Sequence, residues 1–209
     1  RQQHMILIDS HAHLDDEAFA ADLPEVLDRA RRNGVAAIVT VGTDAESSRR
    51  ALAIAGREPD VFASVGIHPH EADRAGSAEP LRELAGHPRV VAIGETGLDY
   101  AKRYADPGNQ KRLFLSHLVL GREFGKPVVI HCRDAHRDAI GILQAEKVRR
   151  GVIHCFSGTA EDAREYLEMG FDLSIAGPVT YPNAAGLRAA VAAIPLDRLL
   201  VETDCPLLA

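Results

Sequence analysis

Short apolar runs alternate along the chain with longer stretches in which apolar residues recur every three or four positions. The first run, 6–8, ends at Asp9, and seven similar runs follow: 36–41, 61–67, 90–93, 127–130, 152–153, 171–175 and 199–201. The stretches between the runs have helical periodicity: 19–32, 47–57, 81–85, a long one that ends at Gly125, 139–145, 159–169 and 187–193. The pattern predicts strands that alternate with helices.

Alternation of this kind is typical of βα units that build a parallel sheet. The runs are almost continuously apolar, as expected for strands that are buried on both faces. Eight such units close most economically into a (β/α)8 TIM barrel, an α/β fold, with a doubly wound sheet as the alternative. No G-x-G-x-x-G or G-x-x-x-x-G-K-[ST] motif follows a run, which disfavours nucleotide-binding forms of the doubly wound sheet.

The two ends of the chain add two expectations. We expect residues 5–209 to form a single barrel domain, and residues 1–4, which precede Met5, to be left from cloning. The chain stops five residues after Asp204, where an eighth outer helix would begin. We therefore expect the last outer helix to be missing from this chain.

Composition narrows the class of protein. The net charge of −6 argues against general binding of nucleic acids through a basic surface, although metal ions could supply positive charge locally to a nuclease. An odd number of cysteines, three, in a sequence without a recognisable secretion signal indicates a reducing compartment, so we expect a cytoplasmic protein, monomeric or weakly oligomeric. The lack of a C-x-x-C pair argues against a zinc site built from thiolates. No apolar run approaches the ~20 residues needed to cross a membrane, and no membrane association is expected.

Polar residues gather where the predicted strands end. In a parallel barrel the carboxyl ends of all strands meet on one face, where active sites are built. The residues at these ends are His11, His13, Thr43, Asp44, His68, His70, Glu95, His131, His154, Pro178, Glu202 and Asp204. Four of the imidazoles and two of the carboxylates are too many for one tetrahedral zinc and suit two divalent metals with open positions.

The candidate metal ligands are His11, His13, Glu95, His131, His154 and Asp204. His11 and His13 are two residues apart in a strand, so they point to the same side. Glu95 suits a carboxylate that bridges two cations, and Asp204 suits a ligand or a general base. The competing interpretations are hydrogen-bonded core histidines, a buried structural acid at Glu95 and a turn cap at Asp204.

Four further residues are predicted to contact a substrate. His68 and His70 flank a proline in the loop after the third run, and they could bind a phosphate or serve only the loop structure. Arg133 suits a bidentate contact with an anion. Asp99 could orient Arg133 or a histidine.

The cysteines and the remaining histidines have weaker predictions. Each cysteine directly follows one of the candidate ligands: Cys132, Cys155 and Cys205. Alternation along a strand turns neighbouring side chains to opposite faces, so we expect these thiols to pack between strand and helix. The other histidines have no predicted chemistry: His4 near the start, His87 in a turn, His117 on a helix surface, and His136 without an assignment.

Six segments carry the motif residues in order along the chain. They are Ser-His-Ala-His-Leu-Asp (10–15), Gly-Ile-His-Pro-His (66–70), Gly-Glu-Thr-Gly-Leu-Asp-Tyr (94–100), His-Cys-Arg-Asp-Ala (131–135), His-Cys-Phe-Ser-Gly (154–158) and Glu-Thr-Asp-Cys-Pro (202–206). Together, over nearly the whole chain, they resemble the TatD family of metal-dependent hydrolases, which belongs to the amidohydrolase-like barrels.

The resemblance implies a two-metal site and deoxyribonuclease activity, generally as a 3′–5′ exonuclease on DNA. By motif, the six candidate ligands fall into two sets with a shared bridge: His11, His13 and Asp204 for one metal, His131 and His154 for the other, and Glu95 between them. The lack of a lysine near the end of the fourth strand separates the chain from barrel hydrolases that use a modified lysine. Cys205 stands where a small residue is more familiar in the family.

From these residues and this resemblance we predict an enzyme that hydrolyses phosphodiester bonds of DNA with water activated by two divalent metals, Zn, Mg or Mn. Asp204 would accept the proton of the water, and Arg133 or the loop histidines would steady the phosphate. Hydrolysis of another ester or an amide, including an aminoacyl ester on tRNA, is the alternative on the same metals, since 5% aromatic residues offer limited base stacking. A non-catalytic metal-binding protein is disfavoured because every motif keeps its ligand.

Overall fold

Eight parallel strands form the centre of the molecule in the computed structural model, which describes residues 6–208. The strands are β1 (Leu7–Ala12), β2 (Val35–Val41), β3 (Val61–Val65), β4 (Val90–Asp99), β5 (Val128–Arg133), β6 (Gly151–Ile153), β7 (Asp172–Ile175) and β8 (Leu199–Val201). Each strand pairs in parallel with the next one in the chain. The expectation for residues 1–4 lies outside the described residues.

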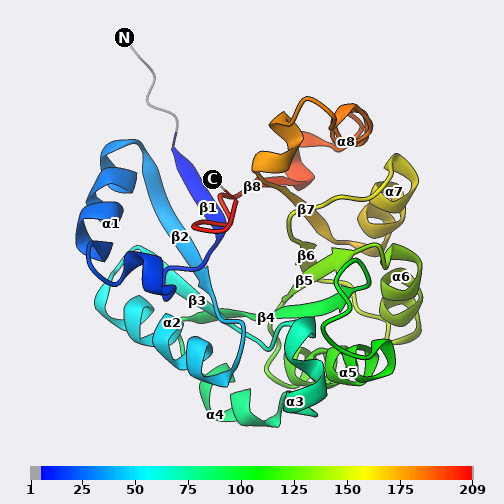
Figure 1. The fold of residues 1–209 in the computed structure, drawn as a ribbon, viewed down its shortest axis with the longest axis horizontal. Coiled ribbons are helices and arrows are strands. Elements are labelled where there is room, and N and C mark those ends of the chain that lie inside the picture. Colours follow the sequence, from blue (N-terminus) through cyan, green and yellow to red (C-terminus); the bar gives the residue numbers. More distant parts are fainter. Residues whose placement is uncertain (1–5, 209) are drawn as a thin grey trace.

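Helices connect the strands and surround them as an outer ring (Figure 1). The α-helices are α1 (Leu23–Arg32), α2 (Ala45–Arg57), α3 (Ala72–Ala75), α4 (Arg82–Ala85), α5 (Pro107–Glu123), α6 (His136–Ala145), α7 (Ala160–Met169) and α8 (Ala185–Val191). Short 3-10 turns are η1 (Glu17–Phe19), η2 (Pro69–Glu71), η3 (Glu79–Leu81), η4 (Gly177–Thr180) and η5 (Leu196–Arg198). The predicted alternation of strands and helices is therefore confirmed.

The sheet curls until the end of its last strand meets its first strand (Figure 1). Just beyond β8, Asp204 donates its backbone N–H to the carbonyl of His11 at 2.9 Å. Thr203 donates its N–H and its hydroxyl to the carboxylate of Asp9 at 3.0 and 2.6 Å. The strand order from β1 to β8 confirms the (β/α)8 barrel, and the alternative of a doubly wound sheet is wrong.

The wall of the barrel is least covered at β8 and β1. Within residues 6–208 no helix follows β8, as expected from the sequence. Ile8 on β1 and Val201 on β8 are accordingly 57% and 49% exposed. In the same range no helix is long and apolar enough to cross a membrane.

The helix predicted for 19–32 is shorter than expected, because α1 begins only at Leu23. Residues 17–19 form η1 instead, and the side chain of Asp16 caps this turn. Pro24 lies in the first turn of α1, where the N–H that proline lacks would have no partner in the helix. Apolar spacing continues through both segments, so periodicity alone did not separate them.

α7 begins at a capping box. The side chain of Thr159 accepts the backbone N–H of Asp162, and the carboxylate of Asp162 accepts that of Thr159. Helix α7 then buries Tyr166 completely, against Phe156 and Phe171. This aromatic layer supports the loop after β6, which carries His154.

The prediction that His117 lies on a helix surface is wrong. This residue of α5 is fully buried, where its Nε2 accepts the N–H of Ile67 at 3.0 Å and its Nδ1 donates to the carbonyl of Leu113 at 2.8 Å. Burial lowers the pKa of His117 to about 4, so the ring is neutral at neutral pH and can both donate and accept. It ties α5 to the loop that presents His68.

Candidate metal centre

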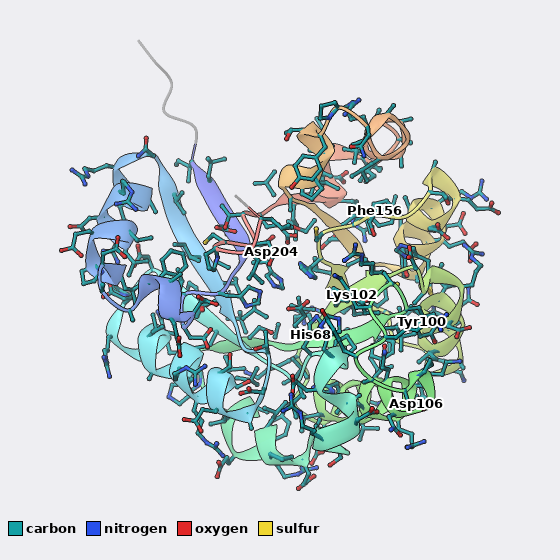
Figure 2. All side chains as sticks on the ribbon, in the orientation of Figure 1. His68, Tyr100, Lys102, Asp106, Phe156 and Asp204 are labelled. Atoms are coloured by element: carbon teal, nitrogen blue, oxygen red, sulfur yellow. The ribbon has the colours of Figure 1, made fainter. Side chains whose placement is uncertain are left out.

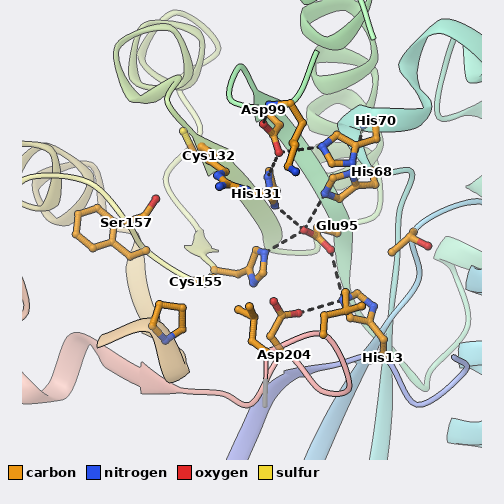
Figure 3. A pocket seen from close by; sticks show the side chains of 18 of the residues that line it. His13, His68, His70, Glu95, Asp99, His131, Cys132, Cys155, Ser157 and Asp204 are labelled. Atoms are coloured by element: carbon orange, nitrogen blue, oxygen red, sulfur yellow. Dashed lines mark hydrogen bonds and ion pairs between the residues drawn. The ribbon is translucent and has the colours of Figure 1, made fainter. Parts of the chain in front are cut away.

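Glu95 lies at the centre of a cluster of imidazoles at the carboxyl ends of the strands (Figure 3). Its side chain, on β4, is 3% exposed. Gly94 precedes it with a φ of 143°, a conformation that side chains rarely adopt, and a Cβ there would collide with the backbone oxygen of Val129. Glycine therefore allows β4 and β5 to approach closely where the carboxylate enters the barrel.

One oxygen of Glu95 faces the two histidines from the end of β1. Glu95 Oε2 lies 3.4 Å from His11 Nε2 and 3.8 Å from His13 Nε2. The two Nε2 atoms are themselves 3.3 Å apart, as expected from their spacing in the strand. Asp204 Oδ1 completes this group at 3.2 Å from His13 Nε2 and 3.7 Å from His11 Nε2.

The other oxygen of Glu95 faces a different set of imidazoles. Glu95 Oε1 lies 2.9 Å from His131 Nδ1 and 3.0 Å from His154 Nε2. His68 Nε2 comes within 3.4 Å of the same oxygen, which adds a third imidazole on this side. The structure thus brings together all six predicted ligands, and they divide into the two predicted sets around Glu95.

Opposite charges compensate one another in this buried cluster. Burial by itself would raise the pKa of Glu95, but the charges of His154 and His68 and the hydrogen bonds of His11 and His131 together outweigh it and hold the pKa well below its usual value. Burial would likewise lower the pKa of His154, yet Glu95 and Glu202 raise it well above the usual value. Such a cluster binds protons in the metal-free protein and can exchange them for a metal cation.

The residues present fit a divalent metal centre. Buried polar atoms normally have a partner, but Asp204 Oδ1 has no hydrogen bond among residues 6–208 although it points at two imidazoles. Two sets of three side chains that contain Glu95 offer ligand atoms within 4.8 Å of one another: His11, His13 and Glu95, and His68, Glu95 and His131. Imidazole and carboxylate together suit zinc and manganese, among other divalent metals.

A cavity of about 670 Å³ opens above the cluster. Every predicted site residue except His11 lines it, since His11 is fully buried beneath.

The residues predicted to contact a substrate differ in whether their polar atoms are free to bind one. Arg133 is exposed at the end of β5, whereas Asp99 is 1% exposed and accepts hydrogen bonds from His70 Nε2 at 2.9 Å and His131 Nε2 at 3.1 Å.

Two residues were missed as members of the site. Lys102 is exposed in the loop after β4, and it lines the cavity together with His68 and Asp204 (Figure 2). Glu202 was noted only as polar at a strand end, yet its Oε1 accepts His154 Nδ1–H at 3.2 Å. Glu202 follows an apolar run directly, and this position was the signal that could have identified it. No pattern in the sequence singles out Lys102.

A family model described as TatD related DNase matches residues 8–209. This chain belongs to the TatD family. The predicted resemblance is therefore confirmed, and with it membership in a family of metal-dependent hydrolases.

Relatives within the family carry different names. The protein named uncharacterized metal-dependent hydrolase YabD, from Bacillus subtilis, is 42% identical over 207 residues, which cover 97% of this chain and 81% of that protein. The 3′-5′ ssDNA/RNA exonuclease TatD of Musicola paradisiaca is 41% identical over 208 residues, 97% of this chain and 79% of that protein. The solved structure of the TatD homologue YJJV from Escherichia coli has a TM-score of 0.91 at 34% identity and covers 96% of this chain and 79% of that chain.

In this TatD family member the prediction for one cysteine is wrong. Cys155 lines the cavity, because β6 ends at Ile153 and Cys155 has a φ of 44°, so strand alternation no longer sets its direction. Cys132 also borders the cavity, but it is 4% exposed and its sulfur lies 3.7 Å from the hydroxyl of Tyr166 on α7, so it packs against a helix as expected. Cys205 is half-buried against the core.

The thiols are expected to react slowly in the folded protein. Burial raises the pKa of Cys132 to about 12 and that of Cys155 to about 11, and it also raises the pKa of Cys205. At pH 8 only about one Cys155 in 10³ is then a thiolate, the reactive form. Iodoacetamide at pH 8 should leave Cys132 and Cys155 unmodified by mass spectrometry and should alkylate all three thiols in urea. Rapid alkylation of Cys155 in the native protein would contradict this expectation.

Proposed function

We propose that this protein is a two-metal phosphodiesterase that removes nucleotides from the 3′ end of single-stranded DNA. The observation that carries the proposal is the division of the Glu95 carboxylate, whose two oxygens face different pairs of imidazoles. A carboxylate divided in this way suits a bridge between two cations. The name of the Musicola relative, a 3′-5′ ssDNA/RNA exonuclease that is 41% identical, supports the choice of substrate.

Two divalent cations held by the six ligands, as Zn²⁺, Mg²⁺ or Mn²⁺, would supply Lewis acidity that lowers the pKa of a water and neutralises charge on the phosphoryl group. The chain supplies the proton acceptor. Asp204 lines the cavity, and its buried Oδ1 has no hydrogen bond within the described part of the chain, so it is available to accept the proton of the attacking water.

Cationic and neutral donors at the rim bind the phosphate. Arg133 and Lys102 are exposed and line the cavity, and both suit phosphates next to the scissile bond. His68 Nδ1 accepts the backbone N–H of His70 at 3.2 Å, so the neutral ring carries its proton on Nε2, on the side of the cavity. This N–H lies 3.4 Å from Glu95 Oε1, and it would be free to donate to a phosphoryl oxygen once cations engage that carboxylate.

The far wall of the cavity is apolar and suits the rest of a nucleotide. It is lined by Pro178, Tyr181, Leu187, Leu207 and Leu208. Tyr181 is 45% exposed and Leu207 is 63% exposed, so both side chains are accessible to a bound nucleotide. The ring of Tyr181 offers a face for stacking of a base, despite the low aromatic content of the chain.

Metal-free protein is expected to leave a single-stranded oligonucleotide intact and to degrade it after Mg²⁺, Mn²⁺ or Zn²⁺ is restored. With a 5′ label, removal of nucleotides from the 3′ end shortens the labelled strand in single steps on a sequencing gel. EDTA should stop the reaction. The metal that restores the highest rate identifies the most effective cation.

The pattern of products separates the alternatives. Fragments of internal lengths at early times would contradict exonuclease action and indicate an endonuclease. No cleavage by protein that holds two bound metals would contradict the phosphodiesterase proposal. Aminoacyl-tRNA and simple carboxylic esters would then be the next substrates for the same metal centre.

A further inference from the structure

The two pairs of histidines differ on the side that faces away from Glu95. We call His11 and His13 the first half-site, and His131 and His154 the second half-site. In the second half-site each imidazole donates its other N–H to a buried carboxylate. His131 Nε2 donates to Asp99 Oδ2 at 3.1 Å. His154 Nδ1 in turn donates to Glu202 Oε1 at 3.2 Å.

Glu202 is held firmly in its position behind His154. It is 8% exposed, and its Oε1 also accepts the backbone N–H of Cys155 at 2.7 Å. Its Oε2 accepts the hydroxyl of Ser174 at 2.5 Å, and Ser174 in turn lies 2.9 Å from the hydroxyl of Ser10. Residues from β1, β7 and the end of β6 thus fix a carboxylate that follows β8 and that cannot reach a substrate.

Asp99 is held in a comparable way behind His131. It is 1% exposed at the end of β4, and its Oδ1 accepts the backbone N–H of Lys102 at 2.9 Å. Its Oδ2 receives His70 Nε2 at 2.9 Å in addition to His131. Both oxygens are therefore engaged within the protein, which leaves Asp99 little capacity to bind a substrate.

In the part of the chain that the structure describes, no carboxylate accepts the other N–H of His11 or His13 in the first half-site. His13 Nδ1 donates to the backbone carbonyl of Val41 at 2.9 Å. His11 Nδ1 is buried and has no hydrogen-bond partner among residues 6–208. The ligand atoms of His11, His154 and Glu202 lie within 4.8 Å of one another, but only His154 donates to Glu202.

We propose that Glu202 and Asp99 are positioning residues that set the metal affinity of the second half-site and leave that of the first half-site nearly unchanged. When His154 is neutral and its proton is on Nδ1, hydrogen-bonded to Glu202, the lone pair of Nε2 is free and faces Glu95. The bond from His131 Nε2 to Asp99 leaves Nδ1 free in the same way. A carboxylate behind a ligating imidazole fixes its tautomer and ring orientation and increases its basicity.

The proposal rests on the two-metal centre of the proposed function and predicts two distinguishable metal-binding steps. Zn²⁺ titration of metal-free protein against a competing fluorescent chelator should resolve two ions in the wild type. Glu202→Gln and, separately, Asp99→Asn should weaken one of the two ions by about 10–100-fold and leave the other at its wild-type affinity. Circular dichroism checks that each variant is folded.

A matched control is available within β1. Asp9 is also 8% exposed, and its carboxylate contacts Thr203 and backbone but no imidazole. Asp9→Asn should leave the second half-site unchanged, so a loss of affinity confined to Glu202→Gln and Asp99→Asn supports the proposal. Wild-type affinity for both ions in these two variants would overturn it, as would equal weakening of both ions or a single Zn²⁺ in the wild type.

The metal titration does not depend on catalysis, so it separates this proposal from the proposed function. If the wild type binds two Zn²⁺ ions and the variants lose one, the positioning roles stand even where no DNA is cleaved. If DNA is cleaved but the variants bind both ions normally, the phosphodiesterase proposal stands and the positioning roles are wrong.

Discussion

Replacing Glu95 by glutamine is expected to remove bound metal from the centre and to lower phosphodiester hydrolysis by about 10³-fold or more, equal to roughly 4 kcal/mol of transition-state stabilisation. The carboxylate lies between the two histidine pairs, and each of its oxygens faces one pair. A neutral amide of the same shape offers one oxygen and no charge. The remaining ligands would then be four neutral imidazoles and the carboxylate of Asp204, and this single negative charge is too little to hold both cations.

The metal content of Glu95→Gln is measured by elemental analysis after dialysis, next to its rate on a single-stranded oligonucleotide. Glu71→Gln is the matched control, since Glu71 lines the same cavity and its carboxylate pairs with Arg74. It should keep both metals and a rate close to that of the wild type. Two ions retained by Glu95→Gln would contradict the bridging role.

The metal centre could be predicted from the sequence because it depends on topology more than on individual contacts. Each candidate ligand follows an apolar run, and all strands of a parallel barrel end on the same face. His11 and His154 come from strands far apart in the chain, yet their rings stack with centroids 3.8 Å apart. The order of the strands around the barrel is sufficient to bring such residues together.

Features that depend on loops and on side-chain hydrogen bonds could not be predicted in this way. Lys102 lies in the irregular loop after β4, where no periodicity sets the direction of a side chain. Cys155 stands beyond the end of β6 with a positive φ, outside the range of strand alternation. Glu202 was visible at a strand end, but its bonds to His154 and Ser174 depend on how β7 and β8 curve around the barrel.

Replacing Asp204 by asparagine is expected to lower kcat by about 10²–10⁴-fold while both metals stay bound at saturating metal concentration. Asparagine keeps an oxygen that can ligate a cation, but its amide cannot accept the proton of the attacking water. Asp204 has a φ of 55°, in the left-handed region that asparagine also tolerates, so the backbone bond from Asp204 to His11 should persist. KM should change little.

Asp134→Asn makes the same substitution at nearly the same backbone conformation, since Asp134 has a φ of 53° and is exposed in the loop after β5. Steady-state kinetics and metal content of the two variants should differ only in the kcat of Asp204→Asn. Together with Glu95→Gln, this pair separates metal binding from proton transfer. Loss of metal in parallel with kcat would reduce Asp204 to a ligand, and an unchanged kcat would assign proton acceptance to another group in the cavity.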